Sequence, residues 1–398
     1  MPKTSTSQFI RRVLQRSCSE EIPCEMCHLS SSSSKGGTNG CKHSDDQFST
    51  TSSSATNSPR RTPRRPLTSA RESQLMQKVK CMVPRLSPSL RKGDCGRIAI
   101  FGGCVMYSGA PYLAGISALK TGADLVHVFC EKEAGQVIQS YSPEMIVHPV
   151  LDQEYGAEEI DAWLPRLDCV VMGPGLGRNQ AMLGRISIIL EKVKMLNIPI
   201  VIDSDGLWHL MTNPLILKGY TRAVITPNAV EFSRLVSIIL KKEVSPTVCP
   251  DHQLVGELAR ALGNLTVIHK GAHDVISDGK YTEDCHTGGS PRRCGGQGDI
   301  LAGMVATFST WAFSSHHHPV KHQLGNLSKH ELGNLSKPNN INPDDPGPAV
   351  LAGWAACTLS RGCAAMAYNQ QGRGATAVDI ISQVQTEFSR IFESETFI

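Results

Sequence analysis

The feature that most constrains the fold is a repeated pairing of a short apolar segment with a segment of helical periodicity. Helical periodicity is clear at residues 111–121, 181–196 and 300–311. Strands buried on both faces read as continuous apolar runs, and their alternation with helices is typical of parallel strands joined by crossovers. We therefore predict an α/β fold, a three-layer αβα arrangement around a central, mostly parallel sheet. The expected strands are residues 97–101, 125–130, 169–172, 199–202, 223–225 and 265–268.

The residues that follow these strands are unusual for simple turns. Nearly every expected strand ends in glycine, aspartate or asparagine, as in Gly102-Gly103, Asp203-Ser204-Asp205 and Thr226-Pro227-Asn228. In open α/β sheets, ligands bind beyond the carboxyl ends of the strands. We therefore expect the functional site at this edge of the sheet.

The strongest single motif is the glycine-rich run at residues 288–299, which ends in Gly295-Gly296-Gln297-Gly298-Asp299 before an apolar helix. Successive glycines allow backbone N–H groups to turn toward an anion, and the dipole and free N–H groups of a helix N-terminus favour the same ligand. Asp299 is either a helix-capping residue or a base that removes a proton from a substrate hydroxyl attacking a γ-phosphate. The dense glycine before Asp299 favours the base.

Three further motifs each leave two interpretations open. Asn228 and Glu231 form an N-x-x-E pair that suits water-mediated Mg²⁺ binding, but this spacing is also that of a capping box. Lys270 follows an expected strand and is either a phosphate ligand or a solvated lysine. Asp203 and Asp205 are either helix caps or acids that line the site.

Several functional classes are disfavoured by what the sequence lacks. No Gly-Lys-Ser/Thr follows the glycine run, as a Walker A loop requires, and no His-Arg-Asp loop of a protein kinase is present. Gly102-Gly103 lacks the G-x-G-x-x-G spacing of a dinucleotide-binding turn. The formal charge of +4 is too small to argue for nucleic acid. No apolar run reaches the ~18 residues that a membrane span needs.

The composition divides the chain into a tail and a folded part. Residues 1–92 are rich in serine, arginine and proline, and we predict that this tail is disordered. Residues 1–18 combine basic and apolar side chains without an acid, which fits either an organelle presequence or an ordinary disordered start, and we expect a mitochondrial and/or cytoplasmic location. The folded domain is expected over residues 93–398, with a disordered insertion at about 314–348 and two closing helices near 350–366 and 378–392.

Taken together and in this order, the motifs resemble those of the ATP-dependent NAD(P)H-hydrate dehydratases, a family of carbohydrate-kinase-domain proteins. The resemblance covers essentially the whole expected domain, and it implies a ribokinase-like fold. Each short motif is unspecific alone, whereas the ordered set is specific. The matching segments are Gly102-Gly103, residues 107–111, 141–144, 173–177, 203–208, 226–232 and 292–299.

The resemblance implies a role for each matched position. It makes Asp299 the catalytic base, in contact with the reacting hydroxyl, and it makes Asn228 and Glu231 the residues that order Mg²⁺ through water. The implied substrate contacts are Gly175, Pro227, Asn228, Ala229, Val230, Glu231, Phe232, Ser233 and Asp299. The implied ATP contacts are Lys270, Gly271, Ala272, His273, Asp274, Gly289, Ser290, Pro291, Arg292, Arg293, Cys294, Gly295, Gly296, Gln297 and Gly298.

The activity implied by the resemblance is repair of damaged nicotinamide cofactors. The family uses ATP and Mg²⁺ to remove water from the S forms of hydrated NADH and NADPH, called NADHX and NADPHX, and releases ADP and phosphate. Two other functions stay open: a small-alcohol kinase of the same fold, of the hydroxyethylthiazole or sugar kinase type, and a nucleotide-binding scaffold whose basic tail engages RNA or a membrane. The motifs at 107–111 and 141–144 favour the dehydratase. No nucleic-acid or membrane partner is therefore expected, and homo-oligomerisation is left open.

Overall fold

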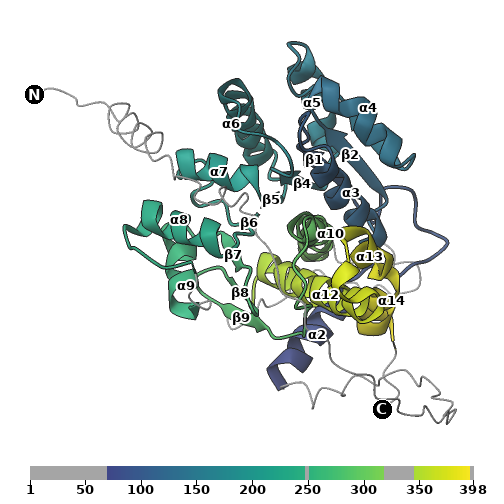
Figure 1. Ribbon diagram of the computed structural model, residues 1–398, viewed down its shortest axis with the longest axis vertical. Helices are drawn as coiled ribbons and strands as arrows, with labels where there is room; N and C mark the ends of the chain where they lie inside the picture. Colours follow the sequence, from purple (N-terminus) through teal and green to yellow (C-terminus); the bar gives the residue numbers. More distant parts are fainter. Residues whose placement is uncertain (1–69, 247–250, 318–344, 395–398) are drawn as a thin grey trace, which may run out of the picture. The chain divides into compact units, whose positions relative to one another are not determined.

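The computed structural model describes residues 70–246, 251–317 and 345–394 (Figure 1). Within these ranges, a sheet of nine strands has the order β3-β2-β1-β4-β5-β6-β7-β8-β9. Neighbours from β3 to β7 pair in parallel, whereas β7, β8 and β9 pair antiparallel. The strands are β1 (Arg97–Phe101), β2 (Leu125–Phe129), β3 (Met145–His148), β4 (Cys169–Met172), β5 (Ile200–Ile202), β6 (Ala223–Ile225), β7 (Thr266–His269), β8 (Asp274–Ser277) and β9 (Thr282–Cys285).

Alternate residues of the central strands enter two separate apolar cores, one on each face of the sheet. In β1, Ile98 and Ile100 belong to one core, while Ala99 and Phe101 belong to the other. This period of two is the geometry of a strand whose successive side chains point to opposite faces. The prediction of a mostly parallel sheet covered by helices on both faces is confirmed.

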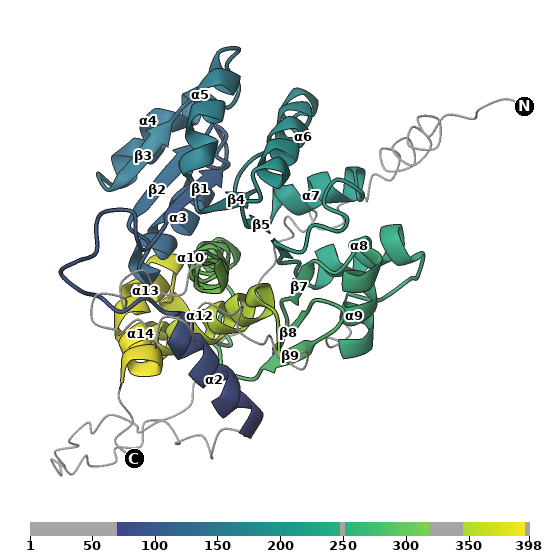
Figure 2. The same ribbon diagram turned by 180° about the vertical axis from the view of Figure 1, so that it is seen from behind.

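Helices form the two outer layers (Figures 1 and 2). Buried residues of α5 (Gly156–Trp163), α6 (Gln180–Met195), α7 (Asp205–Thr212), α8 (Ala229–Leu240) and α9 (His252–Ala261) join the core that contains Phe101. Those of α2 (Ala70–Met82), α3 (Gly109–Thr121), α4 (Lys132–Tyr141), α10 (Gln297–His317), α12 (Pro348–Gln371), α13 (Ala377–Ser382) and α14 (Val384–Phe388) join the other core.

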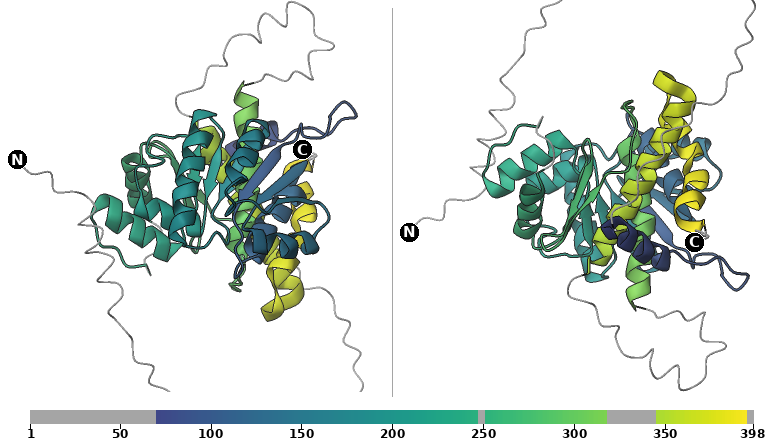
Figure 3. Two further views of the ribbon diagram at one scale, coloured as in Figure 1. Left: turned by 90° about the horizontal axis from the view of Figure 1, so that it is seen from above. Right: turned by 90° about the horizontal axis from the view of Figure 1, so that it is seen from below.

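The prediction that the disordered tail extends to residue 92 was wrong, because a helix lies within it. In α2, Leu75, Val79 and Met82 are buried in the core. Their spacing places them on one helical face, which gains apolar burial against the domain. In the view from below in Figure 3, α2 lies against α12. Residues 1–69, which include the expected presequence, lie outside the described residues.

Several elements differ from the sequence-based prediction. The helix expected at 300–311 is the longer α10, which begins at Gln297, so Asp299 lies in its first turn. Residues 314–317 belong to α10 rather than to an insertion, and 318–344 lie outside the described residues. The expected closing helix at 378–392 is divided into α13, α14 and a π-helical turn at Ser389–Glu393. Short polar-rich segments such as β9 carry a weak apolar pattern and were not predicted.

One helix among the described residues, spanning Pro348–Gly374, is long and apolar enough to cross a membrane by length and composition. Its most apolar window is 72% buried inside the protein. This segment corresponds to α12, which packs against α10 within the core. Its apolar character is therefore accounted for by core packing.

We expect Leu75→Ala to lower the free energy of unfolding by about 2–5 kcal/mol, because it leaves a cavity where α2 meets the core. The matched control is Leu86→Ala, since the Leu86 side chain is 81% exposed whereas Leu75 is only 2% exposed. Denaturant titration of the full chain measures both variants. Equal, small effects would show that α2 contributes nothing to the stability of the domain.

Candidate active site

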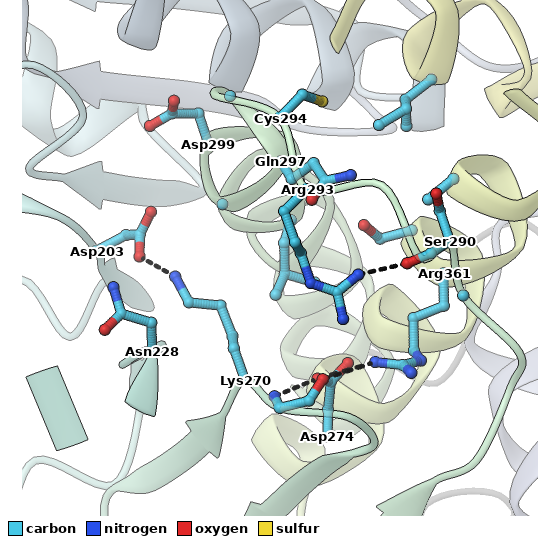
Figure 4. Close-up of a pocket in the computed structure, with 18 of the residues that line it drawn as sticks. Asp203, Asn228, Lys270, Asp274, Ser290, Arg293, Cys294, Gln297, Asp299 and Arg361 are labelled. Atoms are coloured by element: carbon cyan, nitrogen blue, oxygen red, sulfur yellow. Dashed lines mark hydrogen bonds and ion pairs between the residues drawn. The ribbon is translucent and has the colours of Figure 1, made fainter. Parts of the chain in front are cut away.

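Residues that follow three neighbouring strands, β5, β6 and β7, line one cavity of about 700 Å³. The strand order places β5, β6 and β7 next to one another, and they run parallel, so the residues that follow them share one edge of the sheet. Figure 4 shows side chains from this edge facing the start of α10, with α12 forming the opposite wall. The cavity lies where the sequence predicted a functional site.

Asp299 lies in the first turn of α10 and lines the cavity. Only 9% of the residue is exposed. Burial raises the pKa of its carboxyl to about 7, the nearby Asp203 carboxylate adds to this shift, and the Lys270 ammonium opposes it. A carboxyl with a pKa near neutrality is suited to accept a proton from a substrate hydroxyl.

Asp203 and Lys270 form a buried ion pair in the floor of the cavity (Figure 4). Lys270 Nζ lies 2.8 Å from Asp203 Oδ1, and the Thr226 hydroxyl donates a hydrogen bond to the same oxygen at 2.7 Å. The lysine and these hydrogen bonds keep the pKa of Asp203 below its usual value despite burial. Lys270 is therefore held with its positive charge at the cavity, the position that a phosphate ligand requires.

The chain turns sharply after β5, immediately behind Asp203. Ser204 has φ of 51° and ψ of −122°, a backbone conformation that residues other than glycine rarely adopt. Such strain persists only where the surrounding structure fixes it, and it is often found at functional sites. The turn directs the Asp203 side chain toward Lys270 and allows α7 to begin at Asp205.

The glycine-rich run forms the loop between β9 and α10. Gly296 has φ of +88°, which favours glycine. A Cβ atom at Gly298 would lie 3.2 Å from Lys270 Nζ, so the absence of a side chain lets the loop approach the ion pair closely. The Arg293 guanidinium donates a hydrogen bond to the Ser290 carbonyl and lines the cavity. The loop, the helix N-terminus and two cations thus form an anion-binding wall.

Arg361 of α12 closes the far side of the cavity. Its guanidinium lies 3.2 Å from Asp274 Oδ1, donates to the Thr287 carbonyl at 2.7 Å, and also donates to the Ala272 carbonyl. These bonds connect α12 to the segment after β7 and to the glycine-rich loop. Arg361 therefore fixes the relative position of two segments that were predicted to contact ATP.

The N-x-x-E pair forms a capping box at the start of α8. Asn228 Oδ1 accepts hydrogen bonds from the backbone N–H groups of Val230 and Glu231, and Glu231 Oε2 accepts one from Asn228 N at 2.8 Å. Both residues also line the cavity, and burial raises the pKa of Glu231. The capping box uses one of the two Glu231 carboxylate oxygens, so both interpretations of the pair are compatible with this geometry.

The structure brings together most of the predicted ATP contacts and separates many of the predicted substrate contacts. Phe232 is buried and stacks on His269, while the Ser233 hydroxyl donates to the Val244 carbonyl, so both serve packing of α8. Gly175 has φ of +63° and packs against the Tyr107 carbonyl. The predicted residues that do not line the cavity are Gly175, Pro227, Ala229, Val230, Phe232, Ser233, His273, Pro291, Arg292 and Gly295.

Several residues line the cavity without having been assigned a contact from the sequence. Asp203 carried a signal, since it follows a strand, but its role as a cap or a site residue was left open. The residues from α12 and α13 carried none, because their helical periodicity indicates only burial. The unassigned lining residues are Asp203, Ser204, Leu301, Ser360, Arg361, Ala364 and Ile380.

Comparison with known proteins gives the fold and the family. The fold is ribokinase-like: a ribokinase-like superfamily protein from Enterococcus faecalis matches with a TM-score of 0.61 and 17% identity, over 80% of this chain and 95% of that one. A structure titled ADP/ATP-dependent NAD(P)H-hydrate dehydratase from Bacillus subtilis, co-crystallised with ATP/Mg²⁺, matches with a TM-score of 0.52 and 19% identity, over 79% and 97% of the two chains.

Sequence similarity is much higher to a group of animal proteins. The rat protein named ATP-dependent (S)-NAD(P)H-hydrate dehydratase is 46% identical over 319 residues, which cover 80% of this chain and 85% of that protein. The human protein of the same name is 44% identical over 319 residues, with the same coverage. The family model described as NAD(P)H-hydrate dehydratase matches residues 98–331. The expected family is confirmed, and this chain belongs to the NAD(P)H-hydrate dehydratase family.

Proposed function

We propose that this chain uses ATP to remove water from the S forms of NADHX and NADPHX, and so restores NADH and NADPH with release of ADP and phosphate. The names of the relatives supply the reaction. The observation on this chain that carries the proposal is Asp299, a buried carboxyl of raised pKa beside Lys270 and at the end of an anion-binding loop. A phosphoryl-transfer site needs this combination of a base and fixed cations.

The chemistry explains why a dehydratase uses a kinase-like site. Hydroxide is a poor leaving group, and water cannot depart while the hydroxyl is unmodified. Asp299 accepts the hydroxyl proton as that oxygen attacks the γ-phosphate of ATP, and ADP leaves. The ring nitrogen's electron pair then expels phosphate, and loss of a proton from the neighbouring carbon restores the ring double bond.

The fixed positive charges have a separate task. Lys270 is directed into the cavity by its ion pair with Asp203, and Arg293 lines the same wall. Both are placed to attract the phosphate oxygens, on which negative charge builds up during phosphoryl transfer. We assign the nucleotide to the side of the cavity formed by the glycine-rich loop and Arg361, and the hydrate to the side facing Asp299.

We also propose that Asn228 and Glu231 order Mg²⁺ through water. The support is that both line the cavity and that the capping box leaves a second Glu231 oxygen for a water molecule. A divalent cation supplies charge neutralisation at the phosphate oxygens when bound. For the protein's place in the cell, we propose a mitochondrial and/or cytoplasmic location, on the basis of the composition of residues 1–18.

Purified full-length chain with ATP and Mg²⁺ should restore the absorbance of NADH from S-NADHX and release one ADP for each NADH. The control omits ATP, and a parallel sample replaces Mg²⁺ with a chelator; both should be inactive. If the folded chain leaves S-NADHX unchanged and instead releases ADP on a simple alcohol, the small-alcohol kinase is the better description.

Asp299→Asn should lower kcat by about 10²–10⁴-fold, the range that a positioned base contributes, while ATP binding is retained. Because the deprotonated carboxylate is the active form and its pKa is raised to about 7, kcat/KM of the unmodified chain should fall as the pH drops below neutrality. The matched control is Asp161→Asn on α5, where Asp161 pairs with Lys192 at the surface. Full activity in the Asp299 variant would exclude the base.

A rise in pH should increase activity through the Asp299 carboxyl, but it should decrease the contribution of the same carboxyl to the free energy of unfolding. Its folded pKa of about 7 exceeds the ordinary value of 3.8, so its contribution to folding is most favourable at low pH and is lost as the pH rises toward neutrality. In the nucleotide-free chain, Asp299→Asn should therefore raise the free energy of unfolding by an amount that grows from acidic to neutral pH, to the order of a few kcal/mol. A pH-independent difference between the two chains in denaturant titrations would contradict the raised pKa.

A further inference from the structure

A cluster of three histidines around one aspartate lies outside the catalytic cavity. His252 is the first residue of α9, His273 follows β7, Asp284 lies in β9, and His286 comes two residues later. The segments that carry them lie at one end of the sheet, where α9 packs against β7 and β8 (Figure 1). Three histidines, from the start of α9, from the segment after β7 and from just after β9, thus surround a single carboxylate.

The distances in this cluster match those of a transition-metal site. The ligand atoms of His252, His273 and Asp284 all lie within 4.8 Å of one another. His252 Nε2 lies 2.9 Å and His273 Nε2 lies 3.7 Å from Asp284 Oδ1. Ligands at about 2.0–2.1 Å from a tetrahedral zinc ion are about 3.3 Å apart, which falls between these two distances.

A third histidine lies beside this group of three, on the other oxygen of the carboxylate. His286 Nε2 lies 3.9 Å from the other carboxylate oxygen, Asp284 Oδ2, and its ring lies 5.1 Å from that of His273, centroid to centroid. The carboxylate itself is held by its strand: β9 pairs antiparallel with β8, and the Trp354 indole donates a hydrogen bond to the Asp284 carbonyl at 3.1 Å. The histidines are partly exposed, so an ion can enter from solvent.

We propose that His252, His273, His286 and Asp284 form a binding site for a zinc-class divalent ion, separate from the Mg²⁺ proposed in the catalytic cavity. Imidazole nitrogens are borderline ligands that favour Zn²⁺ over Mg²⁺, which prefers oxygen ligands and retains its waters. His252, His273 and Asp284 supply three ligands within reach of one ion, and His286 is the side chain placed to move in as the fourth ligand of a tetrahedral site. Without an ion, the His252 imidazole shares a hydrogen bond with the Asp284 carboxylate, and the test has to distinguish a metal site from this contact alone.

The position of His273 gives this ion a structural consequence. His273 lies between Ala272 and Asp274, both of which line the catalytic cavity and contact Arg361. An ion that binds His273 to β9 and to the start of α9 fixes this segment from outside. Zinc should therefore change how the cavity accepts the nucleotide, although it touches neither the nucleotide nor Asp299.

The test is competitive titration of the metal-free, reduced full-length chain with Zn²⁺ against a chromophoric chelator. The cluster variant is His252→Ala/His286→Ala, which leaves His273 in place. The matched control is His316→Ala/His317→Ala/His318→Ala, which removes the other histidine cluster evident in the sequence. We expect the control to retain one equivalent of bound Zn²⁺ and the cluster variant to bind that equivalent at least 10-fold more weakly, since even the outer partners of metal ligands contribute about 10–100-fold.

Two further measurements separate this site from the cysteines and from a folding defect. Co²⁺ bound at the cluster should give visible d–d bands without thiolate charge-transfer absorption, and those bands should be absent in the cluster variant. Zn²⁺ should raise the melting temperature of the unmodified chain and not that of the cluster variant, whose metal-free melting temperature should be unchanged. Unaltered Zn²⁺ affinity in the cluster variant, or loss of binding in the control, would overturn the site.

The effect on the nucleotide is measured separately, because it rests on the proposed function whereas metal binding does not. Zn²⁺ should change the KM for ATP of the unmodified chain at least twofold and leave the KM of the cluster variant unchanged. An equal response of both chains would show that the ion does not act through His273. The titration above would then still decide whether the site exists.

Discussion

The buried ion pair between Asp203 and Lys270 is the interaction on which the site depends. The Asp203 side chain is 1% exposed and that of Lys270 is 20% exposed, next to the central strands β4, β5 and β6, which are apolar throughout. Removing either partner would leave an uncompensated buried charge, which costs more than the pair itself contributes. Each partner therefore depends on the other to remain charged in the folded chain. Its consequence is a lysine fixed at the cavity before any ligand arrives.

The same pair sets the chemistry of its neighbours. Asp203 keeps its charge and thereby favours the protonated form of Asp299, while Lys270 acts in the opposite direction. The glycine at 298 allows all three groups to approach, since a side chain there would press on Lys270 Nζ. The turn after β5, the start of α10 and the ends of β5 and β7 thus place the Lys270 ammonium near the Asp299 carboxyl. This separation of roles follows from how deeply each carboxyl is paired and buried.

The sequence predicted the part of the site that lies at strand ends, because polar residues after apolar strands are a local signal. Asp299, Lys270 and the glycine-rich loop are found together for that reason. The sequence did not predict Arg361, since a single arginine on an apolar helix has no local signature and its contacts arise from packing of α12. It also placed Phe232 and Ser233 in the substrate site, although their positions on α8 turn them toward the core and the following loop. A family resemblance assigns a whole segment to the substrate site, whereas the geometry of the helix decides which side chains of that segment face the cavity.

The charge balance of the cavity explains why a base of this kind needs cations on more than one side. A bound polyphosphate adds negative charge beside Asp299 and so favours its protonated, inactive form. Lys270 is the fixed charge that opposes this effect at Asp299, and Arg293 and the dipole of α10 add positive potential at the phosphates. The Asp203 carboxylate holds Lys270 in place, but it also offsets part of the positive charge of the Lys270 ammonium. The Mg²⁺ proposed near Glu231 would add positive charge at the phosphates and so help to keep Asp299 deprotonated when a nucleotide is bound.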